Sequence, residues 1–143
     1  MRETKYRAWD KKLKEMFPVH ELVFNRFDGA PTTIKGYTHD EKDVWNVHGG
    51  HFMKYANAPR YELLEYTGLK DKNGNEIYEG DFVHIHIPII GSEVTDFFGT
   101  VKFYEGAFWV DDNEVAIPLW SEINIPFIVG NIYENPELLE EYL

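Results

Sequence analysis

The segment from Tyr66 to Val83 constrains the fold more than any other part of the chain. It reads YTGLKDKNGNEIYEGDFV and places two turn signals, Asn73-Gly74 and Glu79-Gly80-Asp81, on either side of the apolar pair Ile77-Tyr78. Glycine takes positive φ without the steric cost that other residues carry, so both signals predict sharp turns. We therefore expect a short strand whose Tyr78 enters the core, followed by Gly80 in a turn that Asp81 locks as a hydrogen-bond acceptor.

Residues 81–87 alternate in hydropathy directly after this segment. Alternation predicts a strand with one buried face, because successive side chains of a strand point to opposite sides. The expected core face carries Val83, Ile85 and Ile87, and the expected outer face carries Phe82, His84 and His86.

More short strands and one helix are predicted towards the C-terminus. Glu105-Gly106 is a tight turn, and Asn135 is expected to cap a helix over the last eight residues, with Pro136 at its first position. Short strands at this spacing predict a mainly β fold built on a small twisted barrel. The strands are expected at residues 97–104, 107–110, 115–119 and 127–133.

The first sixty residues are less regular. Residues 2–9 and 19–24 predict a β-hairpin. Residues 28–59 are interrupted by glycine and proline and predict an irregular excursion, with short strands near 32–37 and 51–55. We expect two domains, an N-terminal β-hairpin and irregular lobe over 1–60, and a barrel with a C-terminal helical turn over 61–143.

Composition narrows the possible partners and compartments. The chain has no cysteine, which excludes disulfides and thiolate metal sites and favours a reducing, cytoplasmic location. No apolar run approaches the roughly 20 residues of a membrane span, so we expect no membrane association. The formal net charge is −11, which makes general nucleic-acid binding unfavourable. The basic side chains that do cluster belong to a hairpin that we interpret as solvated, with a local phosphate-binding edge as the alternative: Arg2, Lys5, Arg7, Lys11, Lys12 and Lys14.

Two histidine pairs are candidate metal ligands. His84 and His86 would project from one strand face about 6.5 to 7 Å apart, a spacing that two zinc ligands can use. His48 and His51 flank a Gly-Gly pair in the irregular region. Neither pair has an adjacent third ligand, and histidine on a solvated strand face is common, so we expect no metal and no cofactor.

Acidic side chains offer two further candidate sites. Asp111, Asp112 and Glu114 could act as an acid–base pair or hold a divalent ion, but Asp-Asp-Asn is also good turn chemistry. Glu79 and Asp81 could be a catalytic pair, but their place before a strand favours a structural role. With no phosphate-binding loop of the GxxxxGK type in the sequence, the chain is expected not to be an enzyme.

Large aromatic side chains exceed what a small barrel hides. A contiguous apolar patch on a protein surface usually marks a partner-binding site, although the same rings could fill the space between two lobes. The candidates are Trp45, Phe52, Tyr55, Tyr61, Phe108, Trp109 and Trp120.

Three motifs occur in the order seen in the YopX-like family of phage and prophage proteins, which the chain resembles over nearly its whole length. They are Arg7-Ala8-Trp9-Asp10, the Tyr66–Val83 segment, and the stretch from Gly130 to Leu139. The resemblance implies a β-rich fold with a barrel of the SH3 kind and no assigned activity. The signature residues, expected to be structural, are Trp9, Gly68, Gly74, Tyr78, Gly80, Asp81, Gly130, Asn135 and Pro136.

The sequence leaves three functions open. The first is a non-enzymatic accessory protein of the bacterial cytoplasm, a module that forms homo-oligomers or binds a phage or host protein. The second is a nucleic-acid-linked factor in phage replication or transcription, and the third is a metal-dependent hydrolase that uses the histidines. A barrel fold alone does not decide among them, because one fold serves many functions.

Overall fold

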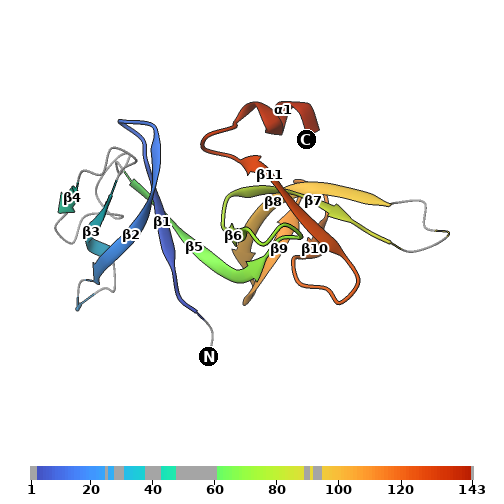
Figure 1. Cartoon of the computed structure of the whole chain (residues 1–143), viewed down its shortest axis with the longest axis horizontal. Helices are drawn as coiled ribbons and strands as arrows, with labels where there is room; N and C mark the ends of the chain where they lie inside the picture. The colour runs from blue at the N-terminus through green and yellow to red at the C-terminus, as the bar shows by residue number, and fades with distance from the viewer. Residues whose placement is uncertain are drawn as a thin grey trace. The chain divides into compact units, whose positions relative to one another are not determined.

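The computed structural model describes residues 3–24, 26–27, 31–37, 43–47, 61–88, 91 and 95–142 (Figure 1). In these ranges nearly all regular structure is β. The strands are β1 (Tyr6–Asp10), β2 (Glu15–Phe24), β3 (Pro31–Tyr37), β4 (Asp43–Val47), β5 (Tyr61–Lys70), β6 (Glu76–Tyr78), β7 (Asp81–His86), β8 (Asp96–Tyr104), β9 (Ala107–Asp111), β10 (Ala116–Pro118) and β11 (Ile125–Asn131), and the helix is α1 (Glu137–Tyr142).

The chain packs as two units that are described separately. The N-terminal unit is Lys5–Leu64, and the C-terminal unit is Glu65–Leu143 together with Met1–Thr4. One sheet has the strand order β4-β3-β2-β1-β5-β6 and the other β10-β9-β8-β7-β11. Strand β5 belongs to both units, because the division falls inside it. The sequence places the boundary earlier, between residues 60 and 61.

The hairpin of β1 and β2 turns at residues 11–14, under the control of Asp10. Its Oδ1 accepts hydrogen bonds from the backbone N–H groups of Lys12 (2.9 Å) and Leu13 (3.2 Å). Its carbonyl oxygen accepts one from Lys14 N–H at 2.7 Å. Aspartate at the start of a turn commonly makes such bonds, which here hold the turn in one conformation.

Two aromatic rings pack together in the buried cluster that the structure describes for the N-terminal unit. Phe17 and Tyr61 meet edge to face, with 5.9 Å between ring centres. Ala8 and Ile34 complete the buried cluster. The sequence counted Tyr61 among the exposed aromatics, and this is wrong: the side chain is 1% exposed. Trp9, a signature residue, is also buried in this unit.

The C-terminal unit is built on the antiparallel sheet of β7 to β11. Its core lies on one side of this sheet and includes Ile77 from β6. The predicted core face of residues 81–87 is correct, since Val83 and Ile85 are buried and Ile87 packs against them. The turn at Glu105-Gly106 takes positive φ at both residues (51° and 77°), the geometry of the type I′ turn that is common in two-residue hairpins.

The mainly β fold and the short C-terminal helix are confirmed by the structure. The five strands form an open order, with β10 and β11 as its ends, rather than a ring. A sheet of this size closes only if its end strands pair, and no such pairing occurs among the described residues. The likeness to an SH3 barrel therefore stays a prediction. The strand predicted near residues 51–55 lies outside the described residues.

Candidate interaction surface

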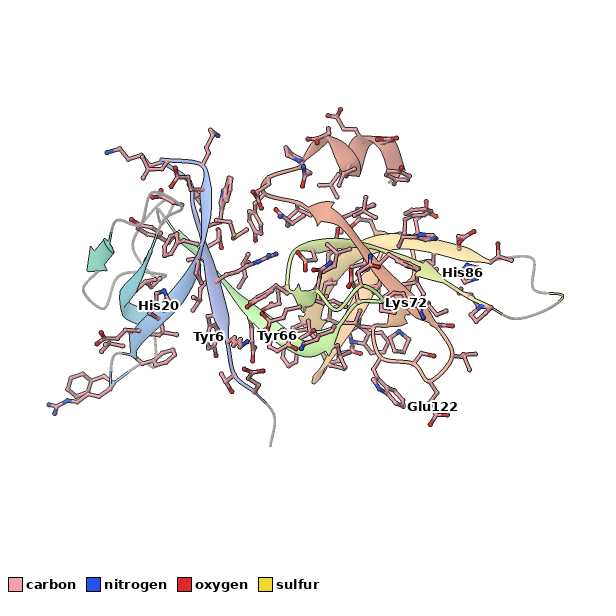
Figure 2. All side chains as sticks on the ribbon, in the orientation of Figure 1. Tyr6, His20, Tyr66, Lys72, His86 and Glu122 are labelled. Atoms are coloured by element: carbon pink, nitrogen blue, oxygen red, sulfur yellow. The ribbon has the colours of Figure 1, made fainter. Side chains whose placement is uncertain are left out.

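The side of the C-terminal sheet opposite its core is the outer face. It carries alternate residues of β7, β8 and β9, because neighbouring side chains of a strand point to opposite sides. The register places His84 opposite Phe98, His86 opposite Asp96, and Lys102 opposite Trp109. Figure 2 shows His86 projecting near the end of β7. Aromatic, histidine and carboxylate side chains therefore meet on one surface.

Four rings form a stacked row across this face. Phe127 lies 5.9 Å from His84, His84 lies 4.5 Å from Phe98, and Phe98 lies 4.7 Å from Tyr142, measured between ring centres. The first three come from neighbouring strands, β11, β7 and β8. Tyr142 comes from α1 and is 42% exposed. The stacked row ends in a ring that a partner can contact.

Phe82 lies on the same face but is fully buried. The sequence predicted its side chain beside the histidines on the outer face. In the structure the ring of Tyr142 packs against it, with 5.6 Å between ring centres, and shields it from solvent. Helix α1 therefore covers this part of the sheet (Figure 1). Alternation along the strand could not predict this burial, because Tyr142 is 60 positions away along the chain.

His84 and His86 meet a carboxylate that the sequence did not single out, Asp96. His84 Nε2 lies 2.6 Å from Asp96 Oδ1, and His86 Nδ1 lies 3.3 Å from the same oxygen. Hydrogen bonds from the two rings hold the pKa of Asp96 below its ordinary value. In the described ranges no group of three His, Asp or Glu side chains is arranged to hold a metal ion. His48 and His51 lie outside those ranges.

The β8–β9 hairpin ends in four aromatic rings, which we call the aromatic tip: Phe103, Tyr104, Phe108 and Trp109. Tyr104 and Trp109 stack on the outer face with 5.7 Å between ring centres, and Phe103 and Phe108 meet on the other side at 4.9 Å. Phe103 is 49% exposed and Tyr104 is 36% exposed. Trp109 Nε1 donates a hydrogen bond to the Tyr104 carbonyl at 3.0 Å, which fixes the indole. The aromatic tip is thus an ordered apolar surface in contact with solvent.

In the acidic turn after β9, the carboxylates accept hydrogen bonds from the backbone of the turn. Asp111 Oδ1 accepts from Asn113 N–H at 2.7 Å, and Asp112 Oδ1 accepts from the N–H groups of Glu114 and Val115 at 2.8 Å each. The Val115 and Glu114 hydrogen bonds lower the pKa of Asp112. Asp111 also contacts Lys102 Nζ at 3.7 Å. These are turn contacts of the kind that the Asp-Asp-Asn sequence favours.

The charge of the chain is divided unevenly along its length. Residues 65–143 contain sixteen of the 25 Asp and Glu but three of the 14 Lys and Arg, a formal net charge of −13. Residues 1–64 carry the remaining nine acidic and eleven basic side chains, a net charge of +2. Lysine and arginine supply most of the affinity for phosphates, so the C-terminal unit is the less suited of the two to nucleic acid.

Gly80 and Asp81 organise the second turn of the signature segment. Gly80 has φ +83°, and a Cβ there would lie 2.8 Å from Tyr133 Cε2. Asp81 Oδ2 accepts a hydrogen bond from Tyr78 N–H at 2.8 Å. The core position expected for Tyr78 is instead filled by Ile77, which is fully buried, whereas Tyr78 is half-buried with its ring against Tyr66.

Glu79 is engaged with β5 rather than with Asp81. Its Oε1 accepts a hydrogen bond from Glu65 N–H at 3.1 Å, and its own N–H donates to the Glu65 carbonyl at 3.0 Å. Burial raises the pKa of Glu79, and the Glu65 carboxylate adds to the effect. Nearby, Gly68 takes φ +86° where the register between β5 and β6 shifts.

Asp71 connects the first turn of the signature segment to β11, a role that the sequence did not predict. Its Oδ1 accepts from the N–H groups of Asn73 and Asn75 at 2.9 Å each, and its Oδ2 accepts from Ile128 N–H at 3.1 Å. Burial by itself would raise the pKa of Asp71, but the three N–H donors outweigh it, and the pKa lies below its ordinary value. Gly74 takes φ +85° in the same turn, with open space around it.

The C-terminal signature is built around Asn131. Its Oδ1 accepts from the N–H groups of Tyr133 and Glu134, at 3.0 and 2.8 Å. Asn135, expected to cap α1 with its side chain, instead accepts from Asn131 N–H at 3.2 Å. A Cβ on Gly130 would lie 2.6 Å from Asn135 Oδ1, so glycine permits this close return of the chain. Pro136 directly precedes α1, one position earlier than expected.

The remaining aromatic candidates fall into three groups. Trp120 is 62% exposed, and Phe108 and Trp109 are half-buried in the aromatic tip. Trp45 lies on β4, where the structure describes the backbone alone, and Phe52 and Tyr55 lie outside the described residues. Within the part of the chain that is described, no helix has both the length and the apolar character needed to cross a bilayer.

Comparison with known proteins places the chain among relatives of the same fold. The family described as YopX protein matches residues 5–140. The crystal structure of protein EF1440 from Enterococcus faecalis is similar with a TM-score of 0.64 at 25% identity, over 97% of this chain and 99% of that one. That of YopX from Bacillus subtilis has a TM-score of 0.63 at 24% identity, with the same coverage. No curated protein matches. The chain belongs to the YopX protein family.

Proposed function

We propose that this chain is a phage or prophage accessory protein of the bacterial cytoplasm and acts as a non-enzymatic protein-interaction module. Its binding surface is the outer face of the C-terminal sheet together with the aromatic tip. The partner is a phage or host protein or a second copy of the chain. The family resemblance supports the phage or prophage origin, and the exposed aromatic surface supports binding to a protein.

The observation that carries the proposal is the exposure of the aromatic tip. Phe103 and Tyr104 adjoin the turn and leave large ring areas in water, at 49% and 36% exposure. Rings that are already ordered lose little conformational entropy on binding, which makes them effective anchors of an interface. The exposed ring of Tyr142, at the end of the stacked row, is a further candidate anchor on the same unit.

Two further observations support a protein partner without catalysis. The net charge of −13 in residues 65–143 opposes the approach of a phosphate backbone. The carboxylates that could have formed an acid–base pair make turn and strand contacts instead, Asp81 with Tyr78 N–H and Glu79 with Glu65 N–H.

Changing Phe103 to serine is expected to reduce partner capture at least about tenfold, because a buried aromatic anchor of an interface contributes about 2 kcal/mol or more. The tagged full chain is used to capture proteins from lysogenic or infected cells, with quantification by mass spectrometry. Nuclease treatment of the lysate should leave the captured protein unchanged.

The matched control is Val115→Ser, which removes an apolar side chain that is 58% exposed in the same unit but outside the aromatic tip. This variant should capture as well as the parent. Equal capture by both variants and the parent would contradict the proposal. Capture that nuclease abolishes would support the nucleic-acid-linked function instead.

A further inference from the structure

The turn at residues 11–14 has the features of a binding element. Lys12, Leu13 and Lys14 are all exposed, and Leu13 leaves 52% of its surface in water. Asp10 holds the turn through three hydrogen bonds to its backbone, at 2.7 to 3.2 Å. An apolar side chain between two ammonium groups on a rigid turn can dock with little loss of conformational entropy. We call this element the basic turn.

The C-terminal unit offers a surface with the opposite charge. Glu140 lies in the first turn of helix α1, and the last turn holds Glu141 and has no basic residue. Carboxylates are unfavourable there because the carbonyl end of a helix carries partial negative charge, and a cation is favoured. The exposed ring of Tyr142 lies beside them, stacked on Phe98. We call this surface, Glu140, Glu141 and Tyr142, the acidic corner.

The two surfaces match in both charge and polarity. Two lysines flank one leucine in the basic turn, and two glutamates adjoin one exposed ring in the acidic corner. The division of charge along the chain, +2 for residues 1–64 and −13 for residues 65–143, favours the same pairing at longer range.

We propose that the acidic corner binds the basic turn of a second copy of this chain. Lys12 and Lys14 contact Glu140, Glu141 and the carbonyl end of α1, while Leu13 packs on Tyr142. The proposal rests on the proposed function in that it names one partner for the outer face. Because two different surfaces meet, each copy can give one contact and receive another, either reciprocally within a two-fold dimer or from one copy to the next in a larger assembly.

The test uses two charge-reversed variants of the full chain. The turn variant is Lys12→Glu with Lys14→Glu, and the corner variant is Glu140→Lys with Glu141→Lys. Sedimentation velocity at tens of micromolar protein and low salt should show the parent self-associating. Each variant alone should associate at least about tenfold more weakly, because like charges then face each other. An equimolar mixture should associate again, since each variant carries the complement of the other.

Matched controls separate this contact from a change in total charge. Lys70→Glu with Lys72→Glu alters the net charge as the turn variant does, and Glu114→Lys with Glu122→Lys alters it as the corner variant does. All four side chains are exposed on the C-terminal unit, with Glu122 in the loop between β10 and β11 (Figure 2). Both controls should associate like the parent. Circular dichroism confirms that every variant is folded.

Three results would overturn the inference: a parent that stays monomeric at low salt, variants that associate like the parent, or a mixture that does not recover association. None of these results bears on the aromatic tip. A monomeric parent whose capture of another protein still depends on Phe103 would refute the basic-turn contact and leave the proposed function standing.

Discussion

Gly80→Val is expected to destabilise the C-terminal unit by about 3 kcal/mol or more. Gly80 has φ +83°, where a β-branched residue is strained, and a Cβ there would lie 2.8 Å from the ring of Tyr133. The backbone cannot easily move away, because Gly80 N–H donates to the Val101 carbonyl and its own carbonyl accepts from Ile132 N–H, both at 2.9 Å. Denaturant unfolding measures the loss.

Gly74→Val is the matched control for backbone strain. Gly74 has nearly the same φ, +85°, but nothing lies within 4 Å of an added Cβ. The left-handed conformation alone should cost about 1 to 2 kcal/mol. The difference between the two variants then measures the close approach of Tyr133 to Gly80. Equal losses would show that this contact contributes nothing to stability.

Asp71→Ala is expected to lower the free energy of unfolding by about 3 kcal/mol. The carboxylate accepts three backbone N–H groups, and the one from Ile128 joins residues 57 positions apart. Asp112→Ala is the control, because Asp112 accepts two N–H groups within its own solvated turn. Water can replace those bonds, so its loss should be about 1 kcal/mol or less. Equal losses would contradict the role given to Asp71.

The contribution of Asp71 also depends on pH. Its pKa in the folded protein lies below the ordinary value. Such a carboxyl stabilises the fold fully above its unfolded pKa of about 3.9, and the contribution is lost as the pH falls through the folded pKa. The gap in stability between the parent and Asp71→Asn should therefore be constant near neutral pH and narrow below about pH 4. A gap that widens in acid would contradict this assignment.

Local turn and strand chemistry was predictable from the sequence. The positive φ of Gly74 and Gly80 follows from the tolerance of glycine for that conformation, and the Glu105-Gly106 pair marks the next tight turn. The buried positions of β7 follow from alternation, since Val83 and Ile85 are both in the core. These features are determined by residues that are adjacent in the sequence, so local motifs are enough to predict them.

Burial and cross-strand contacts were not predictable in the same way. Phe82 is buried because Tyr142 covers it, and Asp96 meets the two histidines because of the β7–β8 register. Ile77 takes the core position expected for Tyr78, which a two-residue apolar strand cannot decide by pattern. Each depends on a partner elsewhere in the chain. The Asp-Lys-Asn-Gly-Asn pattern signals the turn at Asp71 but gives no hint that it reaches β11.

Site-specific photo-crosslinking in cells can capture protein bound at the outer face and the aromatic tip. A photoreactive phenylalanine replaces Tyr104 in the aromatic tip, and the same residue replaces Asn73 as the control, at an exposed turn of the same unit. We expect discrete protein adducts from position 104 and none from position 73. Adducts from position 73 alone, or from neither position, would contradict this expectation.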